Sequence, residues 1–170
     1  MIEATSSQGY ALEVVQDSNF KGKSVITTLA VLGGDLIAQI SGHREMGAPN
    51  RFTVQVSVSR HIDGLWQLTY MNHSCAPNVF LDTTELSVFA LRDIAVGEEL
   101  SFFYPSTEWR MAEPFECLCG TPECIGKIAG AEVLSAETLA RYKVNQHILA
   151  LHRGSAHTVG VQDALTTTPD

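Results

Sequence analysis

The chain has 170 residues, of which 45% are hydrophobic and 18% charged, as is typical of one globular domain with a single core. Its 11 basic and 19 acidic residues give a net charge of −8, which argues against direct binding of DNA or RNA, because phosphate binding depends on clustered lysine and arginine. No apolar run approaches the ~20 residues of a membrane-spanning helix and no secretory signal is visible, so we expect an intracellular protein that is not bound to a membrane.

The first two thirds of the chain have the pattern of short β-strands separated by turns. A Gly33-Gly34-Asp35 turn interrupts the early strands, and residues 52–58 alternate between apolar and polar side chains, as in a strand with one buried face. The predicted strands cover residues 25–26, 29–32, 36–40, 52–58, 65–71, 79–81 and 86–91. The fold is therefore predicted to be mainly β.

The C-terminal part of the chain predicts one helix. Ser135 is a residue typical of a helix N-cap, and apolar side chains recur from Leu139 through Ile148 to about Leu151. Beyond Gly154 the sequence is polar and weakly periodic, so we expect a frayed tail there.

The four cysteines of the chain have a spacing that fits a metal site. Three thiolates, Cys117-x-Cys119-x4-Cys124, can reach one tetrahedral ion, and a structural zinc site needs a fourth ligand, for which Cys75 is the remaining cysteine. Two disulfides in any of three pairings, or four unrelated buried thiols, are the alternatives that the residues leave open. A chain without a secretory signal is expected to stay reduced, which disfavours disulfides.

Three motifs follow one another in a specific order: Asn72-His73-Ser74-Cys75-Ala76-Pro77-Asn78, then Gly97-Glu98-Glu99-Leu100-Ser101-Phe102-Phe103-Tyr104, then the three later cysteines. In this order and spacing they resemble the SET domain, the fold of many protein-lysine methyltransferases, with its cysteine-rich post-SET tail. The resemblance covers about residues 22–128. It implies small curved β-sheets with a pseudoknot, in which one chain passage is threaded under another.

The resemblance also implies how the chain is divided and which metal it holds. We expect a SET domain over residues 1–112, a post-SET cysteine segment over 113–130, a C-terminal helical extension over 131–154 and a flexible tail over 155–170. In the family, the cysteine of the Asn-His-Ser-Cys motif often completes a zinc site with three tail cysteines, so Zn²⁺ is expected at Cys75 and its three partners.

S-adenosylmethionine is the cofactor that the resemblance implies. Gly22-Lys23-Ser24 corresponds to a Gly-x-Gly turn in which missing side chains let the backbone approach the ligand, although here a serine replaces the second glycine. Asn72 and His73 correspond to a pair that contacts the amino acid and adenine ends of the cofactor, and Phe115 and Leu118 are assigned to the same site. On residue types alone, the Asn-His-Ser stretch could equally be a polar turn.

Tyr104 and its aromatic neighbours are the candidates for the reaction itself. A tyrosine that closes a strand more often serves packing, but the resemblance implies that the Tyr104 hydroxyl orients the lysine amine and the sulfonium. A substrate channel should be aromatic, because flat rings accept an alkyl stem and attract a partly methylated ammonium. The candidate channel residues are Tyr70, Phe102, Phe103 and Trp109.

Methyl transfer requires a neutral amine, whereas a free lysine with a pKa of ~10.4 is protonated at neutral pH. Burial beside a sulfonium lowers the lysine pKa by desolvation and by repulsion, so the resemblance does not require a dedicated base. The leading hypothesis is an S-adenosylmethionine-dependent protein-lysine N-methyltransferase acting on a lysine-bearing, basic protein or peptide, which the acidic net charge suits, although that charge could equally serve solubility alone. The alternatives are an enzyme on the same scaffold acting on a small molecule, and a module that binds cofactor or peptide without turnover.

Overall fold

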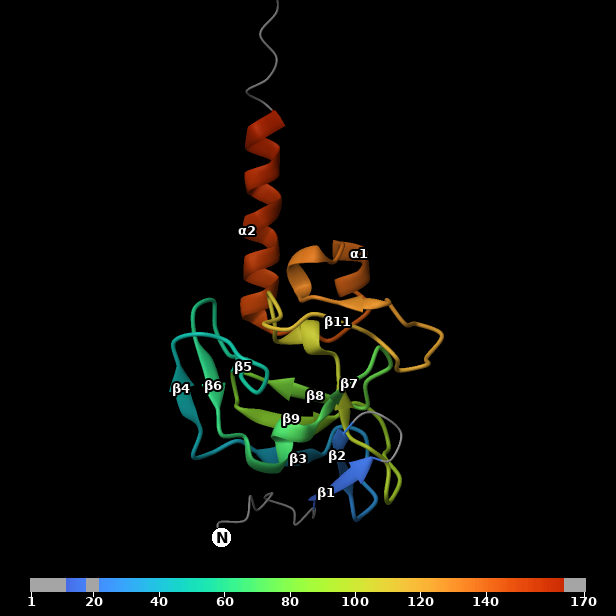
Figure 1. Cartoon of the computed structure of the whole chain (residues 1–170). Helices are drawn as coiled ribbons and strands as arrows, with labels where there is room; N and C mark the ends of the chain where they lie inside the picture. Colours follow the sequence, from blue (N-terminus) through green and yellow to red (C-terminus); the bar gives the residue numbers. More distant parts are fainter. Residues whose placement is uncertain (1–11, 18–21, 164–170) are drawn as a thin grey trace, which may run out of the picture.

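The structure of the chain is a computed structural model that describes residues 12–17 and 22–163 (Figure 1). The strands are β1 (Leu12–Asp17), β2 (Gly22–Thr27), β3 (Leu36–Gln39), β4 (Arg44–Met46), β5 (Val54–Gln55), β6 (His61–Asp63), β7 (Asn72–His73), β8 (Val79–Asp82), β9 (Ser87–Ala90), β10 (Ser101–Phe102), β11 (Phe115–Glu116) and β12 (Lys127–Ile128). The helices are the 3-10 turns η1 (Trp66–Tyr70), η2 (Tyr104–Ser106) and η3 (Ala131–Val133), and the α-helices α1 (Ala136–Leu139) and α2 (Gln146–Asp163).

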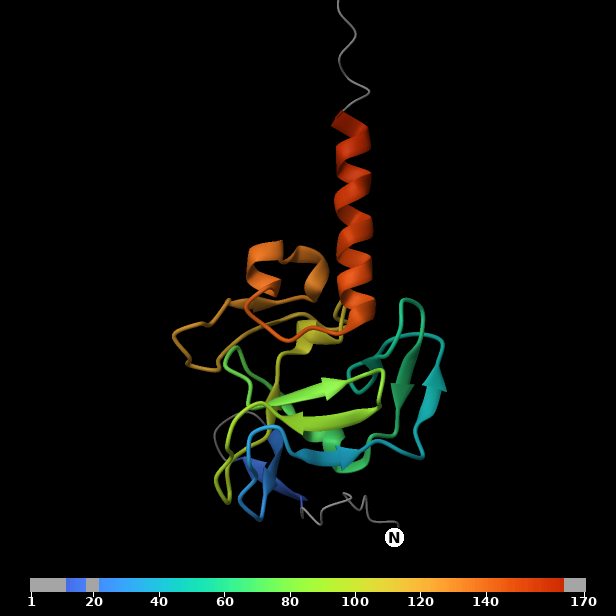
Figure 2. The ribbon, with the colours of Figure 1, turned by 180° about the vertical axis from the view of Figure 1, so that it is seen from behind.

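Two antiparallel sheets of three strands, β3-β9-β8 and β4-β6-β5, carry much of the main core. Consecutive side chains are buried along β3, β8 and β9, and Ile37, Ile62, Leu81 and Val88 are fully buried. Figure 2 shows the β3-β9-β8 sheet from behind, with the β1-β2 hairpin at its lower edge. The predicted strands at residues 36–40, 79–81 and 86–91 correspond to β3, β8 and β9, and the mainly β fold is confirmed.

The prediction of a strand over residues 65–71 is wrong, because this segment forms the 3-10 turn η1. Leu65, Leu68 and Met71 are all buried, and this spacing of three residues is the period of a 3-10 helix rather than of a strand. The positive φ of Gly64 turns the chain into η1. The alternating segment at 52–58 is also shorter than predicted, since only β5 forms within it.

The predicted C-terminal helix is in fact two helices. Ser135 is the N-cap of α1 as expected, with its Oγ accepting a hydrogen bond from the Thr138 N–H at 3.1 Å. The helical conformation is interrupted between α1 and Asn145. Helix α2 then extends beyond the predicted end at Leu151 and projects away from the sheets (Figures 1 and 2). Residues 155–163 of the predicted tail therefore have a helical backbone, and the rest of that tail lies outside the described residues.

Strands β7 and β10 pair in parallel, although 27 residues separate their ends. Asn72 pairs with Ser101, and two further backbone hydrogen bonds, from Ser74 N to Phe102 O and from Asn78 N to Ser101 O, extend the contact at 3.1 Å each. The Asn78 side chain accepts from the Ser101 N–H at 2.9 Å. This parallel pairing places the motif of residues 72–78 and the motif of residues 97–104 side by side.

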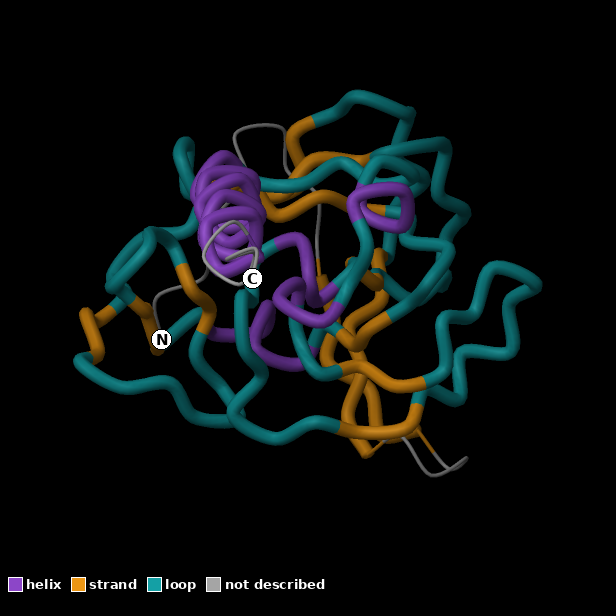
Figure 3. The backbone as a smooth tube through the Cα atoms, turned by 90° about the horizontal axis from the view of Figure 1, so that it is seen from above, coloured by secondary structure: helices purple, strands orange, loops and turns teal. Residues whose placement is uncertain are grey.

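Asn145 fastens the start of α2 to the rest of the domain. Its buried side chain accepts hydrogen bonds from the N–H and the hydroxyl of Thr83 and donates to Leu81 O and Ser106 O, at distances of 2.9 to 3.0 Å. The amide thus joins the loop after β8 to η2, and the break between α1 and α2 is what frees it to do so. Figure 3 looks down the axis of α2, which is seen end-on.

We predict that Asn145→Ala lowers the free energy of unfolding by about 3 kcal/mol, because each buried group left without its partner costs about 1–3 kcal/mol. Chemical denaturation followed by circular dichroism measures this. Gln39→Ala is the matched control: its exposed amide donates to the carbonyls of Glu85 and Leu86, and its removal should cost less than about 1 kcal/mol. Equal losses in the two variants would contradict the prediction.

Candidate active site and cysteine cluster

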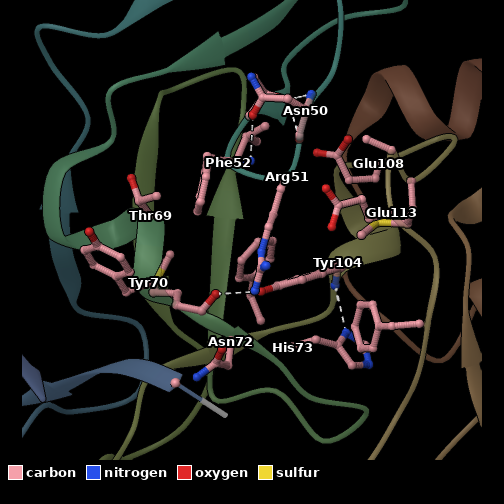
Figure 4. A pocket seen from close by; sticks show the side chains of 18 of the residues that line it. Asn50, Arg51, Phe52, Thr69, Tyr70, Asn72, His73, Tyr104, Glu108 and Glu113 are labelled. Carbon is pink, nitrogen blue, oxygen red and sulfur yellow. Dashed lines mark hydrogen bonds between the residues drawn. The ribbon is translucent and has the colours of Figure 1, made fainter. Parts of the chain in front are cut away.

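A cavity of about 690 Å³ lies beside the β7-β10 pair, between η1, η2 and the segment that leads into β11 (Figure 4). The cysteines Cys117 and Cys119 line it, together with nine of the residues assigned from the sequence to the cofactor site and the substrate channel: Gly22, Lys23, Tyr70, Asn72, His73, Phe102, Tyr104, Phe115 and Leu118. Segments that are distant along the chain therefore supply one continuous wall.

Phe103 and Trp109 do not line this cavity, so the structure does not place them in a channel with Tyr104. Side chains alternate along the extended chain, so Phe102 and Tyr104 face the cavity while Phe103 points to the other side. There Phe103 stacks on Tyr142 with ring centroids 3.6 Å apart. Phe103 belongs to a second, smaller core with Ala131, Leu139 and Ile148, and Trp109 packs against this core. Ser24 is buried and also lies outside the lining.

Tyr104 is held as a hydrogen-bond donor inside the cavity. Its hydroxyl donates to Met71 O at 2.9 Å, and its ring lies 4.8 Å from that of Phe102. Burial raises the pKa of Tyr104 to about 12, so the hydroxyl keeps its proton at neutral pH. The residue can orient a bound group by hydrogen bonding, but it is a poor acceptor of protons.

His73 connects Tyr104 with the cysteines. Burial lowers its pKa to about 4, so the ring is neutral near pH 7. The backbone N–H of Tyr104 donates to Nδ1 at 3.2 Å, which leaves the proton on Nε2, and Nε2 lies 3.3 Å from the sulfur of Cys75. Both ring nitrogens are therefore engaged.

Asn72 and Lys23 join the first strands to this wall. The Asn72 amide donates to Lys23 O at 3.2 Å and to the Glu99 carboxylate at 2.7 Å. The Lys23 ammonium lies 4.8 Å from the centre of the Tyr70 ring, within the range of a cation–π contact. Gly22 has a φ of 81°, a conformation that favours glycine, so the first glycine of the turn is needed even though the second is absent.

The structure brings all four cysteines together. Their sulfurs lie within 4.8 Å of one another, with 3.9 Å between Cys75 and Cys117, and none of the four is in a disulfide. Zinc–sulfur bonds of about 2.3 Å in a tetrahedron would separate the sulfurs by about 3.8 Å, so the cluster fits zinc. Three of the ligands come from the hairpin formed by β11 and β12, where Cys117 N donates to Gly126 O at 2.7 Å.

Several polar residues in the cavity region were not anticipated from the sequence, among them Arg51, Gln55 and Glu108. Glu108 and Arg51 line the cavity, and Figure 4 shows Arg51 reaching across it towards Tyr104. Gln55 does not line it but donates its backbone N–H to Glu108 at 2.8 Å. The one usable signal was the spacing of four residues between Tyr104 and Glu108, which suits one helical turn. Nothing in the sequence placed Arg51 or Gln55 beside them.

Comparisons with known proteins identify the class of the chain. A model of the SET domain matches residues 9–105. The methyltransferase flvH of Aspergillus flavus is 36% identical over 150 residues, which cover 87% of this chain and 84% of that protein. The H3 lysine-36 specific histone-lysine N-methyltransferase of Aspergillus oryzae is 42% identical over 67 residues, which are 36% of this chain and only 7% of that much longer protein.

Solved structures agree with the fold. A structure of KRYPTONITE in complex with mCHG DNA and SAH has a TM-score of 0.57 at 23% identity and covers 69% of this chain and 29% of that one. The methyltransferase domain of human histone-lysine N-methyltransferase SETMAR has a TM-score of 0.54 at 18% identity and covers 71% and 58%. The fold, the cavity and these relatives define a methyltransferase. The chain belongs to the SET-domain family.

No helix within residues 12–17 and 22–163 is long and apolar enough to cross a membrane.

We predict that the purified chain carries one zinc ion and that Cys119→Ser loses it, because three thiolates no longer close the coordination shell. Elemental analysis after gel filtration measures the ion, and the thermal midpoint should fall along with it. Ser59→Ala, at an exposed serine outside the cluster, should keep both values. A wild-type chain without metal, or a full equivalent retained by the serine variant, would refute the prediction.

Proposed function

We propose that the chain is an S-adenosylmethionine-dependent N-methyltransferase that transfers a methyl group to a lysine side-chain amine of a protein or peptide. The observation that carries this proposal is the meeting of Tyr104 with Asn72 and His73 in one cavity. Relatives named as histone-lysine N-methyltransferases support the choice of a lysine substrate.

The cofactor would lie along the wall formed by Gly22, Asn72 and His73. When bound, it supplies the methyl group on a sulfonium. The backbone of the Gly22 turn and the side chain of Asn72 would hold its polar parts, while Phe115 and Leu118 would cover it from the tail. Leu118 is 84% exposed, so a bound molecule would remove a large apolar side chain from water. The SAH in the KRYPTONITE complexes supports this choice of cofactor.

The zinc ion would hold the segment that carries Phe115 and Leu118 in place over the cofactor. Three of its ligands belong to the β11-β12 hairpin and one, Cys75, follows the β7 strand, so the ion would fix the tail against the cofactor wall. The contact between His73 and Cys75 makes the metal site and the cofactor wall neighbours.

The substrate amine would approach between the rings of Tyr70, Phe102 and Tyr104. These rings line the cavity and would accept an alkyl stem, leaving the nitrogen to be oriented by the Tyr104 hydroxyl. Holding the two reacting atoms in line provides much of the rate enhancement of a displacement reaction. The acidic net charge of −8 favours a basic peptide.

Methyl transfer is tested with radiolabelled S-adenosylmethionine and a panel of core histones. The wild type should label protein, and Tyr104→Phe should lower the rate by about 10²–10³-fold, because it removes one oriented donor from the reacting centre. Calorimetry should show that the variant still binds the cofactor. Full activity in Tyr104→Phe would contradict the role of the hydroxyl, and cofactor binding without any product would favour a binding module.

A small-molecule amine is the second candidate substrate. The observation that favours it is the relative flvH, named only as a methyltransferase, which aligns with 87% of this chain and is itself of similar length. The same assay distinguishes the two candidates when free L-lysine and alkyl diamines are included. Labelled small products together with unlabelled protein would replace the peptide substrate by a small amine.

A further inference from the structure

Glu108 stands on the wall of the cavity that also carries Tyr104. It follows η2, and its backbone N–H donates to Tyr104 O at 3.0 Å, so one helical turn connects the two residues. Figure 4 shows both side chains on the same side of the cavity, with the Arg51 side chain reaching towards Tyr104. Glu108 and Tyr104 therefore face the same bound molecule.

The carboxylate is held in place by groups from two other segments. Its Oε1 accepts the backbone N–H of Gln55 at 2.8 Å and the Thr107 hydroxyl at 3.2 Å. The Gln55 side chain in turn accepts from Trp109 N at 2.9 Å. Within the described part of the chain, the hydrogen bonds from Gln55 N and from the Thr107 hydroxyl are those found for the Glu108 carboxylate, and both are accepted by Oε1. Oε2 is therefore available to a molecule in the cavity.

Other cavity residues are poorly suited to accept a proton. Tyr104 keeps its own proton, because burial raises its pKa to about 12, above the ~10.4 of a free lysine. The two ring nitrogens of His73 are engaged, Nδ1 by the backbone N–H of Tyr104 and Nε2 by the sulfur of Cys75. Burial raises the pKa of Glu108 to about 7, which is close to a neutral working pH.

The charged and titratable groups around Glu108 come from several elements. Arg51 precedes β5, Glu113 precedes β11, and Tyr104 begins η2. His61 on β6 pairs with Gln55, and His147 on α2 contacts Thr107 O at 2.9 Å. Burial lowers the pKa of both histidines, so both favour the neutral form and add little positive charge near Glu108.

We propose that Glu108 is the general base of methyl transfer. Its ionised carboxylate takes one proton from the substrate ammonium, which leaves a neutral amine beside Tyr104. The nitrogen lone pair then forms the new C–N bond as the C–S bond of the sulfonium breaks, with the bonding electron pair remaining on sulfur. The carboxylic acid then returns its proton to water. This inference rests on the proposed transfer to an amine.

The test is the pH dependence of kcat/KM for the zinc-loaded full chain, from pH 6 to 10, with whichever amine the labelling assay identifies. Glu108→Gln keeps an oxygen that accepts from Gln55 N but removes the base. Its rate should be about 10³-fold lower at pH 7 and then rise about tenfold per pH unit, approaching the wild type near pH ~10, close to the lysine pKa of ~10.4. The wild type should level off above about pH 7, where Glu108 is ionised.

Controls separate a base from a merely structural carboxylate. Glu85→Gln removes an exposed carboxylate that does not line the cavity and should follow the wild-type profile. Glu108→Asp keeps a carboxylate and should retain the wild-type plateau at reduced rate, which covers the case that Glu108→Gln folds poorly. A Gln variant that equals the wild type at pH 7, or that is slower by the same factor at every pH, would overturn the role of Glu108 as the base but leave the proposed function in place. A wild type that methylates no amine would overturn the proposed function and this inference with it.

Discussion

The parallel pairing of β7 with β10 is the constraint on which the site depends. It joins two segments that are distant along the chain, so Asn72 and His73 come to lie beside Phe102 and Tyr104. Only a short stretch of backbone makes the pair, and the Asn78 side chain reinforces it by bonding to Ser101 N and Glu99 O. A pairing made of so few hydrogen bonds needs support from neighbouring elements, since closing the intervening loop costs entropy.

The C-terminal part of the chain supplies that support. The SET-domain match ends at residue 105, yet Tyr142 stacks on Phe103 and donates to Cys75 O at 3.1 Å. The Asn145 side chain donates to the carbonyl oxygen of Ser106, the last residue of the turn that begins with Tyr104. One helical extension thus fixes both the tyrosine and the first cysteine from behind, which makes it part of the active domain rather than an appendage.

Burial assigns different protonation states to three groups around one cavity. It keeps His73 neutral, keeps Tyr104 protonated and moves the pKa of Glu108 close to 7. In each case desolvation penalises the charged form, which is the protonated form of histidine but the deprotonated form of tyrosine and glutamate, so the pKa falls in the first case and rises in the other two. His73 and Tyr104 therefore add no charge to the wall beside the proposed reacting centre near pH 7. Sequence reasoning treated a dedicated base as unnecessary, because burial beside a sulfonium by itself lowers the pKa of a lysine amine.

The sequence by itself determined the mainly β fold, the three motifs, the four cysteines and the Ser135 cap, because each depends on residue type and local spacing. It did not determine that Leu65 to Met71 form a 3-10 turn, since a period of three in so short a segment also reads as an apolar strand. Only the tertiary structure decided that Phe103 and Trp109 pack behind the cavity and that Arg51 and Glu108 line it. Which face a side chain takes depends on contacts between distant segments, and local pattern carries no record of those contacts.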